Sequence, residues 1–377
     1  MLRTLHLRGY RSLLDFRLEL GRVTVVTGGN GVGKSNLYRA LAMMQRMAEG
    51  NFAAAIAAEG GMPSVAWAGQ RKKDKPIRVE WELEHDFFHY TMECGLVPTV
   101  PGQDTDFRTD PDLKQESLRL HQKGKGREVA RRKGPAVQLR NREGVFESSP
   151  LPLHAPESML SEIRDGIEFP GLSAAREILL SWRFYHQFRT DLDSILRRPQ
   201  VGAWSPVLAH DGANLAATLR TIVETGRGEP LREAVEQGFP GTRWRTLDAN
   251  ARFQLQILRP GLKRWMDASE LSDGTLRFFC LCAALLTPKP PPLIVLNEPE
   301  NSLHAGLMPA LAGLIAAVPP ETQLIVVTHS EALAREIGER TDSRKIDLIN
   351  QDGETRLAEH AGPRRVWTFS GRDEDDD

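Results

Sequence analysis

Cysteine, long apolar runs and an excess of charge of one sign are all scarce in this chain of 377 residues. The three cysteines, Cys94, Cys280 and Cys282, are too few, and odd in number, for a disulfide framework. No apolar run approaches the ~20 residues of a membrane span, and the formal net charge is only −1. We therefore expect a soluble, cytoplasmic protein with no membrane partner and no generally basic nucleic-acid surface.

The segment 28–35, GGNGVGKS, fits the phosphate-binding pattern GxxxxGK(S/T). The apolar run 23–27 before it predicts a buried strand, and the apolar spacing over 36–48 predicts a helix, which is the context that the motif needs. Glycines let several backbone N–H groups point at one phosphate, and the helix N-terminus favours an anion. We predict that the chain binds ATP or GTP, with Lys34 reaching the β- and γ-phosphates and Ser35 ligating Mg²⁺.

Three segments near the end of the chain predict the rest of a nucleotide site. Residues 271–275, LSDGT, precede an apolar helical run, and the apolar strand 293–296 is followed by Asn-Glu-Pro-Glu. A second apolar strand, 324–327, is followed by Thr-His-Ser. This order predicts a parallel α/β arrangement with ligand groups at the carboxyl ends of the strands.

Each of these segments offers a side chain with a chemical role. Glu298 could accept the proton of the water that attacks the γ-phosphate, and His329 could contact that phosphate or hold the water. Ser272 and Gly274, at a helix start, could bind an anion. The plainer alternatives are an exposed strand-end carboxylate, a structural histidine and an ordinary serine N-cap. The accompanying phosphate loop favours the functional interpretation.

One segment, 119–133, is basic and suggests a nucleic-acid contact. It reads RLHQKGKGREVARRK and contains no aromatic residue for base stacking. A solvated hairpin tip is one interpretation, and a finger that grips the phosphates of DNA or RNA is the other.

Four segments resemble the Walker A, ABC signature, Walker B and H-loop motifs of the ABC-type ATPases of DNA maintenance: 28–35, 271–274, 297–298 and His329. The opening LRGYRSLLD, with DGANL at 211–215, is similar to the RecF/SMC/OLD-like group. The resemblance implies an α/β P-loop NTPase head with an antiparallel β subdomain and a helical insertion, and ATP and Mg²⁺ as cofactors. The nucleotide contacts would come from Asn30, Gly31, Gly33, Lys34, Ser35, Asn36, Ser272 and Gly274, and the catalytic groups would be Glu298, His329 and Lys34.

The resemblance also implies a domain plan and a partner. Residues 1–149 would form the N-terminal part of the head, 150–240 a mostly helical insertion, and 241–377 the C-terminal part, ending in a disordered acidic tail. The partner would be a second copy, whose Ser272 and Gly274 contact the ATP held by the phosphate loop of the first. The metal ligands would be Ser35 and Asn297, and Asn297 departs from the Walker B aspartate of the group.

Two functions follow from the resemblance. About 235 residues lie between the Walker A and signature motifs, too few for a long coiled coil at 1.5 Å per residue, and we expect a stand-alone head without its own nuclease domain. The first function is an ATP-hydrolysing dimer that acts on DNA in repair, maintenance or defence against phage. The alternative is a regulatory ATPase subunit that scaffolds a separate effector, such as a nuclease, with little direct DNA binding. A nucleotide switch with little turnover is a third interpretation.

Overall fold

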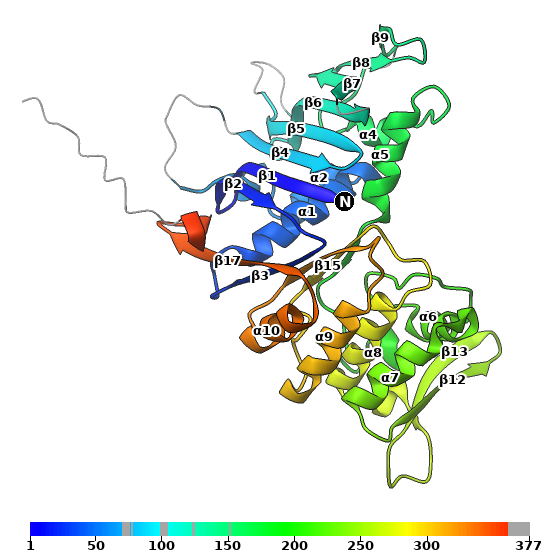
Figure 1. Ribbon diagram of the computed structural model, residues 1–377. Helices are drawn as coiled ribbons and strands as arrows, with labels where there is room; N and C mark the ends of the chain where they lie inside the picture. Colours follow the sequence, from blue (N-terminus) through cyan, green and yellow to red (C-terminus); the bar gives the residue numbers. More distant parts are fainter. Residues whose placement is uncertain (70–75, 77, 99–104, 123–124, 151, 361–377) are drawn as a thin grey trace, which may run out of the picture.

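The computed structural model describes residues 1–69, 76, 78–98, 105–122, 125–150 and 152–360. The acidic segment 373–377 lies outside the described residues. Figure 1 shows a body that contains two sheets with helix α1 between them, and a lobe of helices with a small sheet below it.

The centre of the body is a six-stranded sheet in the order β10-β15-β16-β3-β17-β18, parallel except for its last pair. Its strands are β3 (Val23–Gly28), β10 (Arg183–Tyr185), β15 (Leu293–Asn297), β16 (Gln323–Val327), β17 (Ser343–Gln351) and β18 (Glu354–Leu357). Strands β15 and β16 are buried at every residue, as expected for parallel strands covered on both faces. Val327 pairs with both Val26 and Asn297, so β3, β15 and β16 end at one edge. The predicted parallel α/β arrangement is confirmed.

The second sheet is antiparallel, with eight strands in the order β2-β1-β4-β5-β6-β7-β8-β9. These are β1 (Leu2–Tyr10), β2 (Leu13–Glu19), β4 (Arg78–His85), β5 (Phe88–Leu96), β6 (Pro111–Gln122), β7 (Lys125–Lys133), β8 (Ala136–Arg140) and β9 (Phe146–Ser148). Its inner face packs on α1 (Lys34–Glu49), where the indole of Trp81 donates to the carbonyl of Ala40 at 3.1 Å. The antiparallel subdomain expected from the resemblance is therefore present.

Four shorter helices complete the body: α2 (Phe52–Ala58), α3 (Met62–Val65), α4 (Met159–Glu162) and α5 (Pro170–Ser181). The segment expected to be a helical insertion, 150–240, is divided between two places. Helix α5 contacts α1, and the chain then forms β10, the edge strand of the parallel sheet. Strand β10 has only three residues, and its sequence, RFY, contains two aromatic residues that favour strands. The lobe begins after β10.

The lobe contains most of the remaining elements: η1 (Ile195–Arg197), β11 (Gln200–Val201), α6 (Leu215–Ile222), the π-helical turn η2 (Val223–Arg227), α7 (Gly228–Gly238), β12 (Arg243–Ala249), β13 (Arg252–Leu258), β14 (Met266–Asp267), η3 (Ala268–Glu270) and α8 (Asp273–Leu285). Helix α8 is buried along most of its length, so Cys280 and Cys282 are core residues, and burial raises the pKa of both thiols.

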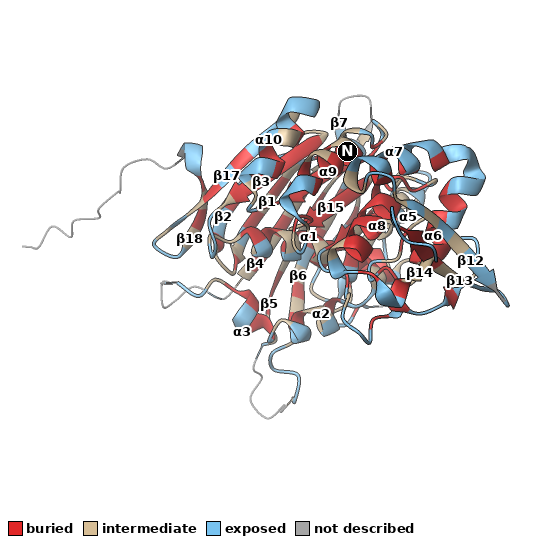
Figure 2. Cartoon of the chain, turned by 90° about the horizontal axis from the view of Figure 1, so that it is seen from below, coloured by how far each residue is buried: buried red, intermediate tan, exposed pale blue. Residues whose placement is uncertain are grey.

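The last elements are η4 (Ala305–Leu307), α9 (Met308–Ala316), α10 (Glu331–Arg340) and η5 (Ala358–His360). A second core cluster joins α8, α9 and α10 to the face of the parallel sheet that α1 does not cover. Figure 2 shows both β3 and β15 as almost wholly buried strands. In the described part of the chain, no helix has the length and apolar character needed to cross a bilayer.

Candidate nucleotide-binding site

The phosphate loop connects β3 to α1. Gly33 caps α1 with φ +102°, and Gly31 has φ +77°, conformations that side chains rarely adopt. The Lys34 ammonium donates to the carbonyl oxygens of Gly28 at 2.6 Å and Gly29 at 2.7 Å. Burial lowers the pKa of Lys34 below its usual 10.5, while the nearby carboxylates of Glu298 and Glu300 oppose that shift. The lysine is thus held over its own loop and within electrostatic reach of the strand-end acids.

Two segments from opposite ends of the chain hold this loop. The hydroxyl of Thr355, on β18, donates to the carbonyl of Val32 at 2.7 Å and is hydrogen-bonded to the Ser12 hydroxyl at 2.7 Å. The Asn36 amide donates to the same Ser12 hydroxyl at 2.8 Å. A Cβ on Gly33 would lie 2.0 Å from the Thr355 hydroxyl, so only glycine fits there. Asn36 therefore braces the loop, while Asn30, Gly31 and Ser35 are exposed.

Glu298 follows β15 at the same edge. Its φ of +49° is a strained conformation for this residue type. It is held by a bond from its N–H to the carbonyl of Val327 at 2.7 Å. Its carboxylate accepts from the Asn301 amide at 2.7 Å. Glu298 thus lies directly beyond the end of β15 and is half-buried.

Asn297 is 1% exposed and pairs with a residue that the sequence analysis missed. Its Nδ2 lies 2.6 Å from Nδ1 of His186, the first residue after β10. Arg277, on α8, donates from Nη2 to the carbonyl oxygens of both His186 and Glu298 at 3.1 Å. In the sequence, His186 directly follows a segment rich in aromatic residues, which favours a strand. The sequence analysis assigned this region as helical, so it did not place His186 at a strand end.

A second missed residue, Glu300, holds His329. Its carboxylate accepts from the Thr328 hydroxyl at 2.5 Å and from the backbone N–H groups of His329 at 3.0 Å and Ser330 at 3.3 Å. Nδ1 of His329 lies 3.1 Å from the same oxygen. Glu300 is buried, whereas the His329 ring is nearly half exposed. A buried acid two residues after Glu298 thus orients the strand-end histidine.

The residues at this edge fit a hydrated Mg²⁺ held mainly by a nucleotide. Asn297 Oδ1 is buried and finds no hydrogen-bond partner among the described residues. An amide oxygen without a partner can accept a hydrogen bond from a metal-bound water. The described part of the chain holds no cluster of three His, Cys, Asp or Glu side chains that could bind a metal. Mg²⁺ is typically bound by one or two protein oxygens together with substrate phosphates.

The signature segment lies at the start of α8. The Ser272 hydroxyl accepts from the N–H of Thr275 at 3.4 Å and is hydrogen-bonded to the Thr275 hydroxyl at 2.8 Å, as an N-cap does. A Cβ on Gly274 would lie 2.5 Å from the carbonyl of Ser302, so the backbone after Glu298 passes close to this helix start. Within the described residues, none of the Ser272 hydrogen bonds reaches the phosphate loop.

Residues 23–335 match the sequence model of the family described as "AAA domain, putative AbiEii toxin, Type IV TA system". The chain belongs to this AAA family. No curated protein sequence matches it significantly.

The fold of this AAA ATPase is similar to that of SMC head domains. An SMC head solved with the C-winged helix domain of ScpA has a TM-score of 0.52 and 15% identity, covering 94% of this chain and 97% of that one. An SMC head with an extended coiled coil, bound to the C-terminal domain of ScpA from Pyrococcus furiosus, has a TM-score of 0.51 and 15% identity, covering 94% and 95%. At this identity the likeness establishes the fold alone.

The basic segment of this AAA ATPase is not the uniformly exposed finger that its composition suggested. Residues 119–122 form the end of β6 and residues 125–133 form β7, while 123 and 124 lie outside the described residues. The Arg132 and Glu116 side chains are 1% and 0% exposed, and Arg132 Nη1 lies 3.3 Å from the Glu116 carboxylate. Arg127, Arg131 and Lys133 are exposed. A DNA contact here would therefore have to exclude Arg132.

Proposed function

We propose that this chain is a Mg²⁺-dependent ATPase that dimerises around ATP and acts in DNA maintenance or in defence against foreign DNA. The observation that carries the proposal is the shared edge of β3, β15 and β16. It brings the phosphate loop, Glu298 and His329 to one end of the parallel sheet, where ligands of such sheets bind.

In this proposal each residue at the edge has one task. The N–H groups of the loop and the Lys34 ammonium bind the phosphates, and the Ser35 hydroxyl and Asn297 Oδ1 would hold Mg²⁺. The metal would neutralise charge on the phosphates. The Glu298 carboxylate accepts a proton from the attacking water, and His329, oriented by Glu300, donates a hydrogen bond to the γ-phosphate.

ATP binding and phosphate release, measured on the same preparations, test the enzymatic part. Lys34→Ala should lose most ATP affinity. Glu298→Gln should retain ATP binding and lose most hydrolysis, because the amide cannot accept the proton. Equal hydrolysis by wild type and Glu298→Gln would contradict the proposed catalytic role and would instead support a nucleotide switch.

Direct DNA binding is a separate part of the proposal. The exposed side chains of Arg127, Arg131 and Lys133 are candidates for this contact. Replacing these three by alanine should weaken duplex binding and make its salt dependence shallower, since each phosphate contact adds to the slope. Unchanged binding and slope would remove this segment from the proposal.

The second candidate is a regulatory subunit that scaffolds a separate effector such as a nuclease. The neutral Asn297, in place of a Walker B aspartate, favours slow turnover and supports this alternative. The two SMC heads named above were solved with domains of another protein, which shows that such a head can carry a partner. Stable co-purification with an effector, combined with no DNA binding by the chain alone, would favour this second function.

A further inference from the structure

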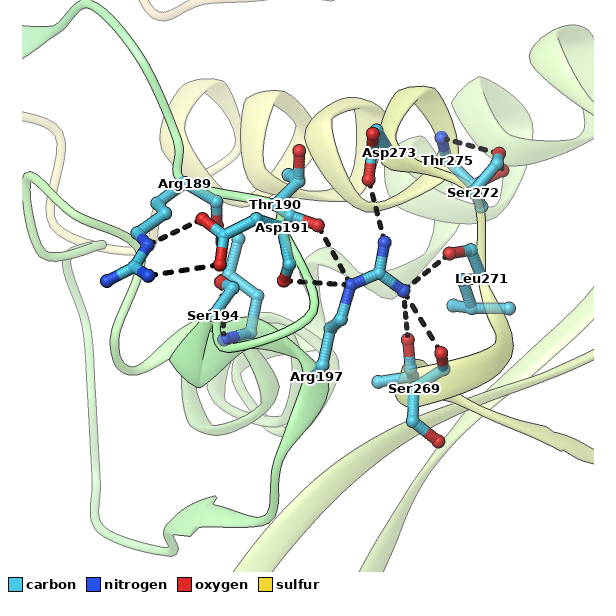
Figure 3. Close-up of polar contacts among 12 residues, drawn as sticks. Arg189, Thr190, Asp191, Ser194, Arg197, Ser269, Leu271, Ser272, Asp273 and Thr275 are labelled. Atoms are coloured by element: carbon cyan, nitrogen blue, oxygen red, sulfur yellow. Dashed lines mark hydrogen bonds and ion pairs between the residues drawn. The ribbon is translucent and has the colours of Figure 1, made fainter.

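A single arginine in the lobe, Arg197, holds the backbone that leads into α8 (Figure 3). Its side chain is 9% exposed. Nη1 donates to the carbonyl oxygens of Leu271 at 2.7 Å and Ser269 at 3.1 Å, and Nη2 donates to the Asp273 carboxylate at 2.7 Å. Because a guanidinium presents its donors in fixed directions, these bonds define the path of the signature segment.

The same guanidinium is fixed from its other side. Nε donates to the carbonyl oxygens of Thr190 at 2.8 Å and Asp191 at 3.1 Å. The Asp191 carboxylate pairs with Arg189 and accepts from the N–H of Asp193 at 3.0 Å, which closes a local turn. Arg197 is therefore set in a preformed loop.

This loop belongs to the segment 186–197, which connects two distant parts of the protein. The segment starts at His186, which contacts Asn297 at the end of β15, and finishes at Arg197 beside the signature. In the dimer proposed above, the first contact lies at the chain's own nucleotide site. The second supports the segment that the chain offers to its partner's nucleotide.

We propose that Arg197 is a positioning residue that holds the signature segment in the shape that completes the nucleotide site of a second copy of this chain. This inference rests on the proposed ATP-bound dimer. The Ser272 hydroxyl and the N–H groups at the start of α8 can bind a phosphate only if they are already in place, because donors that must first be ordered lose affinity. Loss of Arg197 would leave the phosphate loop unchanged and the signature mobile.

The first test uses the full chain in the Glu298→Gln background, which should retain ATP. Arg197→Lys keeps the positive charge but loses the several fixed N–H donors of the guanidinium. Arg197→Met removes the charge and the donors but keeps much of the side-chain volume. Both should bind ATP with unchanged affinity as monomers, and their ATP-dependent dimerisation should weaken by about tenfold or more. Arg198→Met, which removes an exposed arginine directly after Arg197, is the matched control and should dimerise normally.

The second test asks whether Arg197 acts across the dimer. Arg197→Lys, with an intact phosphate loop, is mixed with Lys34→Ala, which has an intact signature, both in the wild-type Glu298 background. Each variant alone should be nearly inactive, and the mixture should regain hydrolysis because one site of each mixed dimer has both intact halves. Thermal unfolding of each variant checks that it is folded.

The two tests distinguish a failure of the Arg197 role from a failure of the ATP-bound dimer. If the Glu298→Gln protein dimerises with ATP and the Arg197 variants dimerise equally well, the inference is overturned and the dimer stands. If the variants lose dimerisation but mixing restores nothing, Arg197 does not act on the partner's site. If the Glu298→Gln protein itself binds ATP without dimerising, the proposed dimer fails and the inference fails with it.

Discussion

The buried carboxylate of Glu300 accepts a hydrogen bond from the backbone N–H of His329 at 3.0 Å and lies 3.1 Å from Nδ1 of the same residue. One oxygen thus fixes both the backbone and the ring of the strand-end histidine. This arrangement makes Glu300 a supporting residue of the proposed γ-phosphate contact, because groups behind a reacting residue set its orientation.

We predict that Glu300→Gln lowers kcat by about tenfold, with little change in ATP affinity. The amide keeps the shape and one acceptor oxygen but loses the negative charge that strengthens the bonds from Thr328, His329 and Ser330. Steady-state phosphate release and ATP titration measure the two quantities. Glu321→Gln, an exposed change near the opposite end of β16, is the control, and equal kcat for the two variants would remove Glu300 from the account.

The brace on the phosphate loop gives a second prediction. Thr355→Val removes the hydroxyl that binds Val32 and Ser12, at a residue that is almost fully buried. We expect a loss of about 1–2 kcal/mol in the free energy of unfolding and weaker ATP binding, since the loop loses its support. Thr355→Ser should restore most of both. Denaturant unfolding measures the stability and ATP titration measures the affinity. A valine variant with wild-type ATP affinity would contradict the role of the Thr355 hydroxyl in supporting the phosphate loop.

The ion pair of Arg132 and Glu116 gives a third prediction, about stability. Arg132→Met leaves a buried carboxylate without its charged partner and should cost about 3–5 kcal/mol. Arg131→Met, one residue away but half exposed, should change stability by about 0.5 kcal/mol or less. Urea unfolding of the two variants measures the difference. Similar losses of unfolding free energy in the two variants would contradict the buried ion pair of Arg132. A large loss for Arg132→Met alone would mean that Arg132 should not be replaced in DNA-binding tests.

The neutral Walker B position gives a fourth prediction. Asn297→Asp should lower the Mg²⁺ concentration needed for ATP binding and raise turnover, because a carboxylate binds a hydrated divalent cation more tightly than an amide. Nδ1 of His186, which lies 2.6 Å from Asn297 Nδ2, can donate a hydrogen bond to the new carboxylate and so offset its burial. A magnesium titration of nucleotide binding tests this. An unchanged Mg²⁺ requirement would show that the metal does not depend on this residue.

The sequence predicts those elements whose pattern lies within one uninterrupted stretch of the chain. The phosphate loop, the strands before Glu298 and His329, and the helix after Ser272 each combine an apolar run with an adjacent polar motif, and the parallel sheet follows from their order. The antiparallel subdomain also carries a local signal, because β4 alternates buried and half-buried residues with a period of two.

Other features depend on contacts between distant segments, which no local pattern records. His186 meets Asn297 across 111 positions, and Ser12 meets Thr355 across 343. The short strand β10 was hidden inside a helical pattern, so the segment after it was not recognised as part of the site. The composition of 119–133 could not separate Arg132 from its exposed neighbours, because its buried partner, Glu116, lies on a different strand.

The proposed mechanism requires two copies of the chain that share ATP. The most direct test is the solution mass of Glu298→Gln by light scattering, with and without ATP and Mg²⁺. We predict a monomer alone and a dimer with ATP, and no shift for the double variant Lys34→Ala, Glu298→Gln. A mass that stays monomeric while ATP binding is measured in the same sample would contradict the shared site.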